Sequence, residues 1–188
     1  MSITSRKKLL TAAEYEALVD EGILSEDDRV ELIEGEVVEM TPIGPPHDSR
    51  VIRLTHLFTR LLGDRALVGV QTSARLSDFT QPQPDFVILR QREDYYAQAH
   101  PGPSDILCLI EVADTSLRFD RGRKGKLYAG YGILDYWIVN LPKNLLEVRR
   151  DPGPDGYASL VTLRRGDRVS LAAFPDLVID VAELLPLP

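Results

Sequence analysis

The chain has 188 residues, a length typical of a single domain over 1–188 that can bury a full core. Hydrophobic residues make up 44% of the sequence and charged residues 27%, which is ordinary for a globular protein. The formal net charge of −7 argues against a protein that coats nucleic acid generally, but it leaves room for a local basic groove beside an acidic site.

The N-terminal part of the chain, 9–41, predicts a helix followed by a hairpin. The helix is expected over 11–22, because Thr11 and Glu14 have the spacing of a capping box. Two short strands with a glycine-containing turn between them are expected over 29–40. We treat this part as an extension in front of the core.

The core is expected over about 46–141. Apolar residues recur at helical spacing over 47–62 and predict its first helix, and a second helix is expected over 117–129. Four strands are expected, the third of them apolar throughout and therefore buried on both faces: 66–76, 84–89, 106–113 and 135–140. The order helix, three strands, helix, strand indicates an α/β (α+β) fold with a mixed central β-sheet flanked by helices.

The C-terminal part, 144–185, is expected to extend this sheet. A hairpin is predicted over 145–163 around a turn rich in proline and glycine. A further strand over 168–174 and a short helix near 181–185 follow.

Two carboxylates are expected at strand ends. Asp85 begins the strand over 84–89, and Glu111 comes at the end of the apolar run "ILCLI". If these strands are antiparallel neighbours, the two carboxylates meet at one edge of the sheet, where they could hold a hard divalent cation. The alternative for Asp85 is a turn residue after Pro84. Glu111 needs a partner, a metal or an exposed strand end, because an unpaired buried carboxylate is costly.

Lys124 lies on the helix that follows Glu111. Asp120, Lys124 and Tyr128 are spaced four residues apart and share one helical face. One interpretation of Asp120 and Lys124 is a surface ion pair of little energetic value. The other directs Lys124 toward the carboxylates, where it would hold an attacking water or stabilise phosphate charge. Spacing alone leaves both open.

These residues resemble a known constellation. The set Pro84-Asp85, Glu111-Val112 and Lys124 is similar to the PD-(D/E)XK nuclease superfamily, with the lysine moved from the strand to the following helix. More closely, the chain resembles the bacterial Uma family of proposed restriction endonucleases, long catalogued as a domain of unknown function. The longest matching stretch is "LIEVADTSLRFDR…K…LYA…GI…YWIV", and "VELIEGEVVEM" and "VQTSARLSDFTQPQPDFVIL" also match. Asn140 departs from the pattern, which often has Asp there.

The resemblance implies a restriction-endonuclease-like core and a site. It implies Mg²⁺ (or Mn²⁺) between Asp85 and Glu111, with the Val112 carbonyl as a further ligand. It implies that Lys124 is the catalytic lysine. It also matches His47 to the histidine at the start of the family's first core helix.

Several residues are implied in supporting roles. Glu31 matches the acidic residue of the family's "ELI-G" strand, and Gln83 falls in the "PQPD" form of the motif. Asp120 and Tyr128 are possible supports of the site. The alternatives remain open: His47 as a helix-capping or packing residue, Glu31 as an exposed strand residue, and Tyr128 as a packing residue.

Two functions of different classes are compatible with these residues. The first is a metal-dependent nuclease that hydrolyses phosphodiester bonds, above all a DNA endonuclease. Its backbone contacts would come from a basic cluster in a chain that is acidic overall: Arg118, Arg121, Arg123 and Lys126. The second is a catalytically weak or inactive nucleic-acid-binding or regulatory module on a nuclease scaffold. Retention of Asp85, Glu111 and Lys124 favours the nuclease.

The sequence also bears on partners and location. No window approaches the roughly 20 apolar residues of a membrane span, and "MSITSRKKLL" lacks the features of a secretory signal. The one cysteine, Cys108, excludes an intrachain disulfide and fits a reducing compartment. We therefore expect a cytoplasmic protein that binds nucleic acid and no membrane. The resemblance suggests a homodimer, to which the tail "LLPLP" could contribute.

Overall fold

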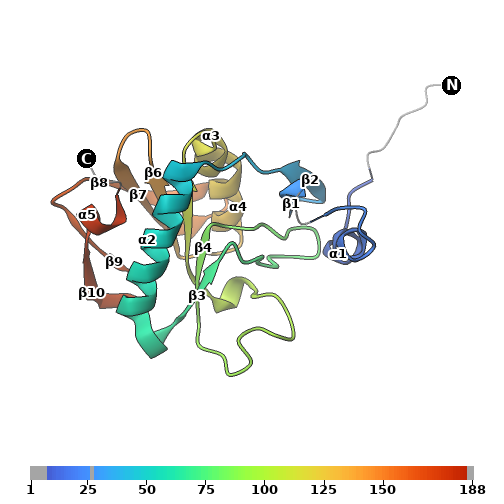
Figure 1. The fold of residues 1–188 in the computed structure, drawn as a ribbon, viewed down its shortest axis with the longest axis horizontal. Helices are drawn as coiled ribbons and strands as arrows, with labels where there is room; N and C mark the ends of the chain where they lie inside the picture. The colour runs from blue at the N-terminus through green and yellow to red at the C-terminus, as the bar shows by residue number, and fades with distance from the viewer. Residues whose placement is uncertain (1–7, 26–27, 186–188) are drawn as a thin grey trace.

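A six-stranded mixed sheet forms the centre of the computed structural model, which describes residues 8–25 and 28–185 (Figure 1). The strands follow one another across the sheet in chain order: β3 (Leu67–Val70), β4 (Phe86–Leu89), β5 (Ile106–Ala113), β6 (Asp135–Asn140), β7 (Leu145–Gly153) and β8 (Gly156–Leu163). β5 and β6 are parallel, and the other neighbouring pairs are antiparallel. The predicted α/β fold with a mixed sheet flanked by helices is confirmed.

One face of the sheet is covered by α2 (Pro45–Leu62). Its buried apolar stripe includes Leu54, Leu57 and Phe58, which belong to the same cluster as alternate residues of β4, β5 and β6. Alternation follows from the strand period of two, since every second side chain points to the same face. The helix predicted over 47–62 is confirmed and begins two residues earlier, at two prolines that suit the first helical turn.

The other face is covered by the crossover between the parallel strands β5 and β6. It consists of α3 (Leu117–Phe119), a π-helical segment η4 (Asp120–Lys124) and α4 (Gly125–Gly130). The helix predicted over 117–129 is therefore present, but its middle is π-helical. Long-range contacts explain the difference, because Tyr136 Oη donates to the Asp120 carbonyl at 3.0 Å and Arg149 Nη1 donates to the Arg121 carbonyl at 3.2 Å.

The N-terminal extension has the predicted form. α1 (Ala12–Asp20) begins at Thr11, whose side chain forms the expected capping box with Glu14. β1 (Val30–Ile33) and β2 (Glu36–Glu39) form the expected hairpin. Leu32 exchanges two main-chain hydrogen bonds with Gln81, which joins the hairpin to the loop before β4.

The C-terminal part differs from expectation at one strand. β7 and β8 form the predicted hairpin, and α5 (Val181–Leu184) the predicted short helix. The single strand expected over 168–174 is wrong, because the chain forms β9 (Arg168–Leu171), turns, and returns antiparallel as β10 (Phe174–Asp180). A hydrogen bond joins this turn to the central sheet, since the Ala172 amide donates to Oδ2 of Asp135 on β6 at 2.7 Å.

The strand expected over 66–76 is also too long, since β3 ends at Val70 and Gln71 adopts φ 47°. This left-handed conformation takes the chain out of the sheet. Short 3₁₀ turns over 63–65 and 103–105 connect the remaining elements.

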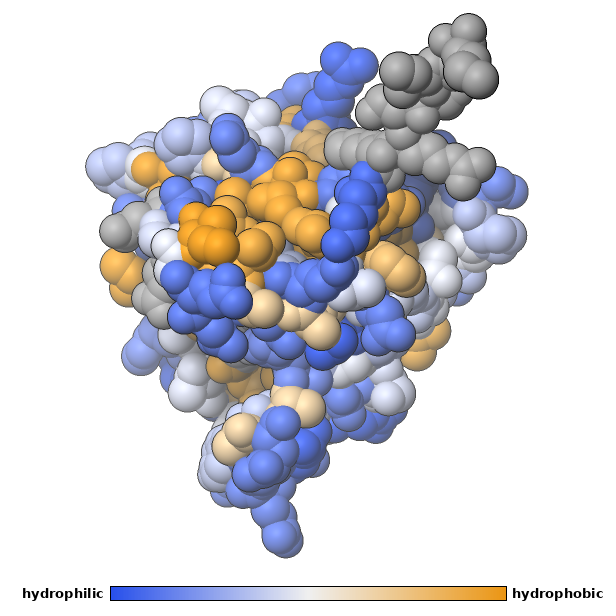
Figure 2. Space-filling model, turned by 90° about the vertical axis from the view of Figure 1, so that its right-hand side faces the viewer, coloured by the Kyte–Doolittle hydropathy of each residue, from blue (hydrophilic) through white to orange (hydrophobic). Residues whose placement is uncertain are grey.

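The side of the molecule that carries α1 and the β1–β2 hairpin has an apolar patch among hydrophilic side chains (Figure 2). Exposed apolar residues of this N-terminal part are Leu9, Val19, Ile23 and Val37. In the described ranges, no helix combines the length and apolar character needed to cross a membrane. Residues 1–7 of "MSITSRKKLL" and the last three residues of "LLPLP" lie outside the described residues. The absence of a secretory signal and the part of the tail in a homodimer therefore stay predictions. The homodimer itself and the domain bounds also stay predictions.

Candidate active site

Asp85 and Glu111 meet at one edge of the sheet. β4 and β5 are antiparallel with Phe86 opposite Ile110, so Asp85, just before β4, faces Glu111. The Asp85 amide donates to Glu111 Oε2 at 3.3 Å, and the Val112 amide donates to Asp85 Oδ2 at 2.8 Å. The condition set by the sequence, antiparallel neighbouring strands, is therefore met. Both carboxylates are buried.

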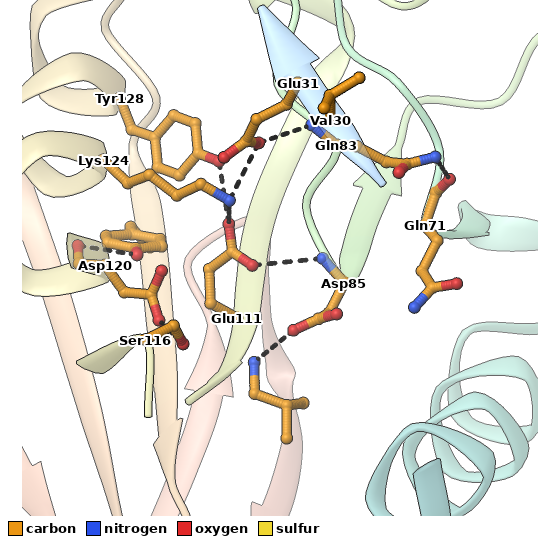
Figure 3. A network of polar contacts seen from close by, with 12 residues as sticks. Val30, Glu31, Gln71, Gln83, Asp85, Glu111, Ser116, Asp120, Lys124 and Tyr128 are labelled. Atoms are coloured by element: carbon orange, nitrogen blue, oxygen red, sulfur yellow. Dashed lines mark hydrogen bonds and ion pairs between the residues drawn. The ribbon is translucent and has the colours of Figure 1, made fainter. Parts of the chain in front are cut away.

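Lys124 reaches the same edge from the π-helical segment. Its Nζ lies 3.1 Å from Glu111 Oε1 and 3.1 Å from Glu31 Oε2, and only 4% of the residue is exposed. Asp120 instead accepts a hydrogen bond of 2.6 Å from Ser116 Oγ. The interpretation of Asp120 and Lys124 as a surface ion pair is wrong, because both side chains are buried. Figure 3 shows the Lys124 ammonium directed at Glu111 and Glu31.

Glu31 belongs to this cluster, and its interpretation as an exposed strand residue is wrong. It is buried, and besides Lys124 it binds the main-chain amide of Gln83 at 3.1 Å. The Gln83 side chain donates to the Gln71 carbonyl at 2.9 Å. The β1–β2 hairpin thus contributes a third carboxylate from outside the core.

His47 lies in the first turn of α2, with Nε2 3.1 Å from Asp85 Oδ2. Its Nδ1 is buried and has no hydrogen-bond partner in the chain as described. Burial lowers the pKa of His47, but the hydrogen bond and the charge of Asp85 outweigh burial, so the pKa lies above its usual value. A raised pKa favours an imidazolium that neutralises part of the Asp85 charge.

The cluster holds more negative than positive charge. The Lys124 ammonium faces three buried carboxylates, those of Glu111, Glu31 and Asp120. A fourth buried carboxylate, that of Asp85, faces His47. The pKa of Glu111 is raised to about 8, mainly by burial and further by the neighbouring carboxylates. The charge of Lys124 acts in the opposite direction but does not outweigh them. Burial likewise raises the pKa of Asp120 to about 6. Burial acts to lower the pKa of Lys124, but the carboxylates raise it above its usual value. A cation at this edge would relieve the excess negative charge.

The pocket in front of these residues is lined by His47, Asp85, Glu111 and Lys124. The pocket is also lined by residues 38–44, at the end of β2 and beyond it, and by residues 114–116 after β5. The pocket therefore opens onto the two carboxylates, so a ligand that enters it reaches both the acidic edge and the lysine.

Comparison with known families gives the setting of this site. The chain matches the model of the Uma2 family, described as "Putative restriction endonuclease", over residues 12–182. The chain belongs to this family. A search of curated proteins finds no match.

The fold is also that of a solved structure. The chain is similar to a crystal structure described as a "putative nuclease belonging to DUF820" from Anabaena variabilis ATCC 29413, with a TM-score of 0.73 and 13% identity. The likeness covers 93% of this chain and 97% of the other. At this identity the likeness shows a shared fold alone.

A divalent metal fits the donors at the sheet edge of this Uma2 chain. Within residues 8–25 and 28–185, no group of three or more His, Cys, Asp and Glu side chains is arranged to hold a metal ion. Asp85 and Glu111 supply two carboxylates that line the same pocket at this edge of the sheet. Mg²⁺ is commonly held by one or two carboxylates together with waters and substrate phosphates, so two suffice. The Val112 carbonyl stays a predicted ligand.

Sequence reasoning missed the residues that shape the π-helical segment. Glu147 on β7 is buried and accepts hydrogen bonds from both Arg121 and Arg149. Asn140, the departure from the family pattern, donates to Glu147 at 3.2 Å, which an ionised aspartate could not do. Tyr128 Oη donates to Glu111 Oε1 at 2.9 Å, so Tyr128 touches the site.

The four basic residues expected at the nucleic-acid backbone divide into two pairs. Arg121 forms an ion pair with Glu147, and Arg123 with Glu34 and Glu36, both at 3.2 Å. Arg118 and Lys126 are exposed. Contact with phosphates stays a prediction for all four, and Arg118 and Lys126 are the more accessible pair.

Proposed function

We propose that this chain is a metal-dependent nuclease that hydrolyses phosphodiester bonds in DNA. The observation that carries the proposal is the buried cluster in which Lys124 binds Glu111 while Glu111 binds the amide of Asp85. Membership of the Uma2 family supports it, because the family carries the description "Putative restriction endonuclease". An isolated buried cluster of this charge would be an expensive way to stabilise a fold, which favours a functional role.

The proposed roles follow from position. Asp85 and Glu111 hold Mg²⁺ or Mn²⁺, which when bound polarises the scissile phosphate and lowers the pKa of a water molecule. Lys124 orients the attacking water and stabilises the charge that builds up on the phosphate. His47 keeps Asp85 oriented through its hydrogen bond of 3.1 Å. Glu31 fixes the direction of the Lys124 ammonium from the opposite side.

The substrate enters where the pocket is open. The exposed Arg118 and Lys126 flank the helical segment that carries Lys124, and they supply local positive charge for the phosphate backbone. A net charge of −7 over the whole chain does not prevent this, because substrate binding depends on the local potential of the cleft.

A cleavage assay tests the proposal. Purified wild-type protein and Asp85→Asn are incubated with single- and double-stranded DNA and RNA, with Mg²⁺, Mn²⁺ or EDTA. We expect metal-dependent cleavage of DNA by the wild type and a loss of at least about 100-fold in Asp85→Asn. Asp176→Asn is a matched control, because Asp176 is an exposed partner of Arg65.

Three outcomes would contradict the proposal. Cleavage that survives Asp85→Asn removes the site assignment, and cleavage in EDTA removes the metal. Binding of nucleic acid without cleavage under any condition favours the alternative, a binding or regulatory module on the nuclease scaffold. Circular dichroism and thermal denaturation show whether each variant is folded.

A further inference from the structure

A second groove adjoins the candidate active site. It lies beside α1 and the loop that leads from β3 to β4, and Arg29 and Ile43 line both this groove and the catalytic pocket. Its wall carries three glutamines, Gln71, Gln81 and Gln83. The role proposed for the catalytic pocket does not use this groove.

Gln81 lines this groove and has an unused hydrogen-bonding group. The residue is 4% exposed, and its main chain is fixed by two hydrogen bonds to Leu32, of 2.7 and 3.2 Å. Its side-chain Oε1 is buried without a partner in the described part of the chain. A buried amide oxygen without a partner destabilises a folded protein, so such atoms call for a ligand or a function.

Gln71 is held in an unfavourable backbone conformation at the same groove. Its φ of 47° is one that glycine adopts most readily. Two contacts maintain it: the Gln71 amide donates to the Asp85 carbonyl at 3.0 Å, and the Gln71 carbonyl accepts from the Gln83 side chain at 2.9 Å. Figure 3 shows the Gln71 side chain extending away from the Gln83 amide that binds its carbonyl. Strain of this kind is common at functional sites.

We propose that this groove holds a nucleobase of the substrate strand beside the scissile phosphate, with the Gln81 and Gln71 side chains hydrogen-bonded to its edge. The inference rests on the proposed nuclease function. An amide places a donor beside an acceptor, which matches the donor and acceptor pattern of base edges. The charged side chains that line the groove are Glu16, Asp20 and Arg29, beside His100, so carboxylates outnumber the guanidinium and a neutral base suits the groove better than a phosphate.

Binding measurements separate this inference from catalysis. The Asp85→Asn variant should bind without cleaving, so fluorescence anisotropy with Mg²⁺ gives its Kd for a labelled single-stranded DNA oligonucleotide. The same measurement is made with a series of oligonucleotides, each of which has one abasic nucleotide at a different position. Mapping of wild-type products locates the scissile phosphate. We expect an abasic nucleotide next to that phosphate to weaken binding roughly 5- to 100-fold, the range of a bidentate base contact.

Gln81→Leu tests the contact itself, and Gln98→Leu, on the exposed loop before β5, is its matched control. Gln81→Leu should weaken binding of the intact oligonucleotide by part of the loss that the abasic nucleotide causes, and it should weaken binding of the abasic oligonucleotide no further. Its Tm should equal or exceed that of Gln98→Leu, because a partnerless buried oxygen is removed. Gln71→Gly should raise the Tm and weaken binding, since it relieves the left-handed backbone and removes the amide.

The outcomes distinguish the two proposals. Equal binding by Gln81→Leu and Gln98→Leu, or additive losses from Gln81→Leu and the abasic nucleotide, overturns the nucleobase site and leaves the nuclease intact. A lower Tm in Gln81→Leu with unchanged binding assigns Gln81 a structural role and also overturns it. Absence of any binding or cleavage overturns both proposals together.

Discussion

The ammonium of Lys124 lies 3.1 Å from Oε1 of Glu111, although 13 residues of chain separate them and one side chain comes from a π-helical segment and the other from a strand. Both groups are buried, so water screens their attraction little. Glu31 binds the same ammonium from the hairpin outside the core. Removal of Lys124 therefore affects stability and the proposed catalysis together.

Lys124→Met should lower the free energy of unfolding by about 3–5 kcal/mol, because buried Glu31 loses its counter-charge and Glu111 loses a hydrogen-bond donor. Cleavage should fall by about 100-fold or more. The double variant Lys124→Met with Glu31→Gln should recover part of the stability and none of the activity. Urea denaturation and single-turnover cleavage give the two values. Recovery of activity in the double variant would contradict a catalytic role for Lys124.

Glu111 should make the metal-free protein less stable as the pH rises. Its pKa is raised from 4.5 to about 8 by burial and by neighbouring carboxylates, so between these values the folded state retains a proton that the unfolded state has lost. Glu111 alone should therefore lower the free energy of unfolding from pH 5 to pH 8 by at most about 1.4 kcal/mol per unit. Asp120 and His47, whose pKa values are also raised, add to this fall. Urea denaturation in EDTA measures it, and Glu111→Gln should flatten the dependence.

Mg²⁺ should oppose this loss of stability. A metal ion competes with the proton on Glu111, so the rise in Tm caused by Mg²⁺ should be larger at pH 8 than at pH 6. Differential scanning fluorimetry with and without Mg²⁺ measures both rises. An equal rise in Glu111→Gln would show that the cation binds elsewhere.

Local patterns were enough to predict the pair of carboxylates. The apolar run before Glu111 indicates a buried strand, and the proline before Asp85 indicates where the preceding strand begins. For the two carboxylates to meet, these strands had only to pair antiparallel, as they do. Helical spacing placed Lys124 on the following helix, and the family resemblance directed it toward the site. These inferences involve short stretches of chain.

The missed features depend on contacts between distant segments. For Glu31 the strand pattern alone favoured an exposed residue, and only the family resemblance implied a role in the site, because nothing in its strand shows that Leu32 pairs with Gln81 and brings the hairpin to the core. The π-helical segment was missed because its carbonyls bind Tyr136 and Arg149, on strands β6 and β7. Propensity and periodicity carry no information on such pairings.

Glu147 should hold the π-helical segment in place. Burial raises its pKa, but hydrogen bonds from Arg121, Asn140 and Arg149 lower it below its usual value, so its contribution to stability is present above about pH 4.5 and is lost as the pH falls. Glu147→Gln should lower the free energy of unfolding by about 1–3 kcal/mol and reduce kcat with KM unchanged. Glu183→Gln, on an exposed ion pair, is the control. Equal stability of the two variants would contradict this role.

The buried side chain of Arg50 should lower the free energy of unfolding. It is 5% exposed, and its Nε and Nη1 have no hydrogen-bond partner within the described residues. Burial, with Arg53 and Arg165 nearby, lowers its pKa to about 10. Replacement of a poorly compensated buried charge by an apolar side chain is often stabilising, so Arg50→Met should raise the free energy of unfolding by about 1–3 kcal/mol. Arg60→Met, on the exposed side of the same helix, should change it by less than about 1 kcal/mol in urea denaturation. A loss of stability in Arg50→Met would mean instead that an anion binds the guanidinium in solution. Added phosphate would then raise the Tm of the wild type and leave the Tm of Arg50→Met unchanged.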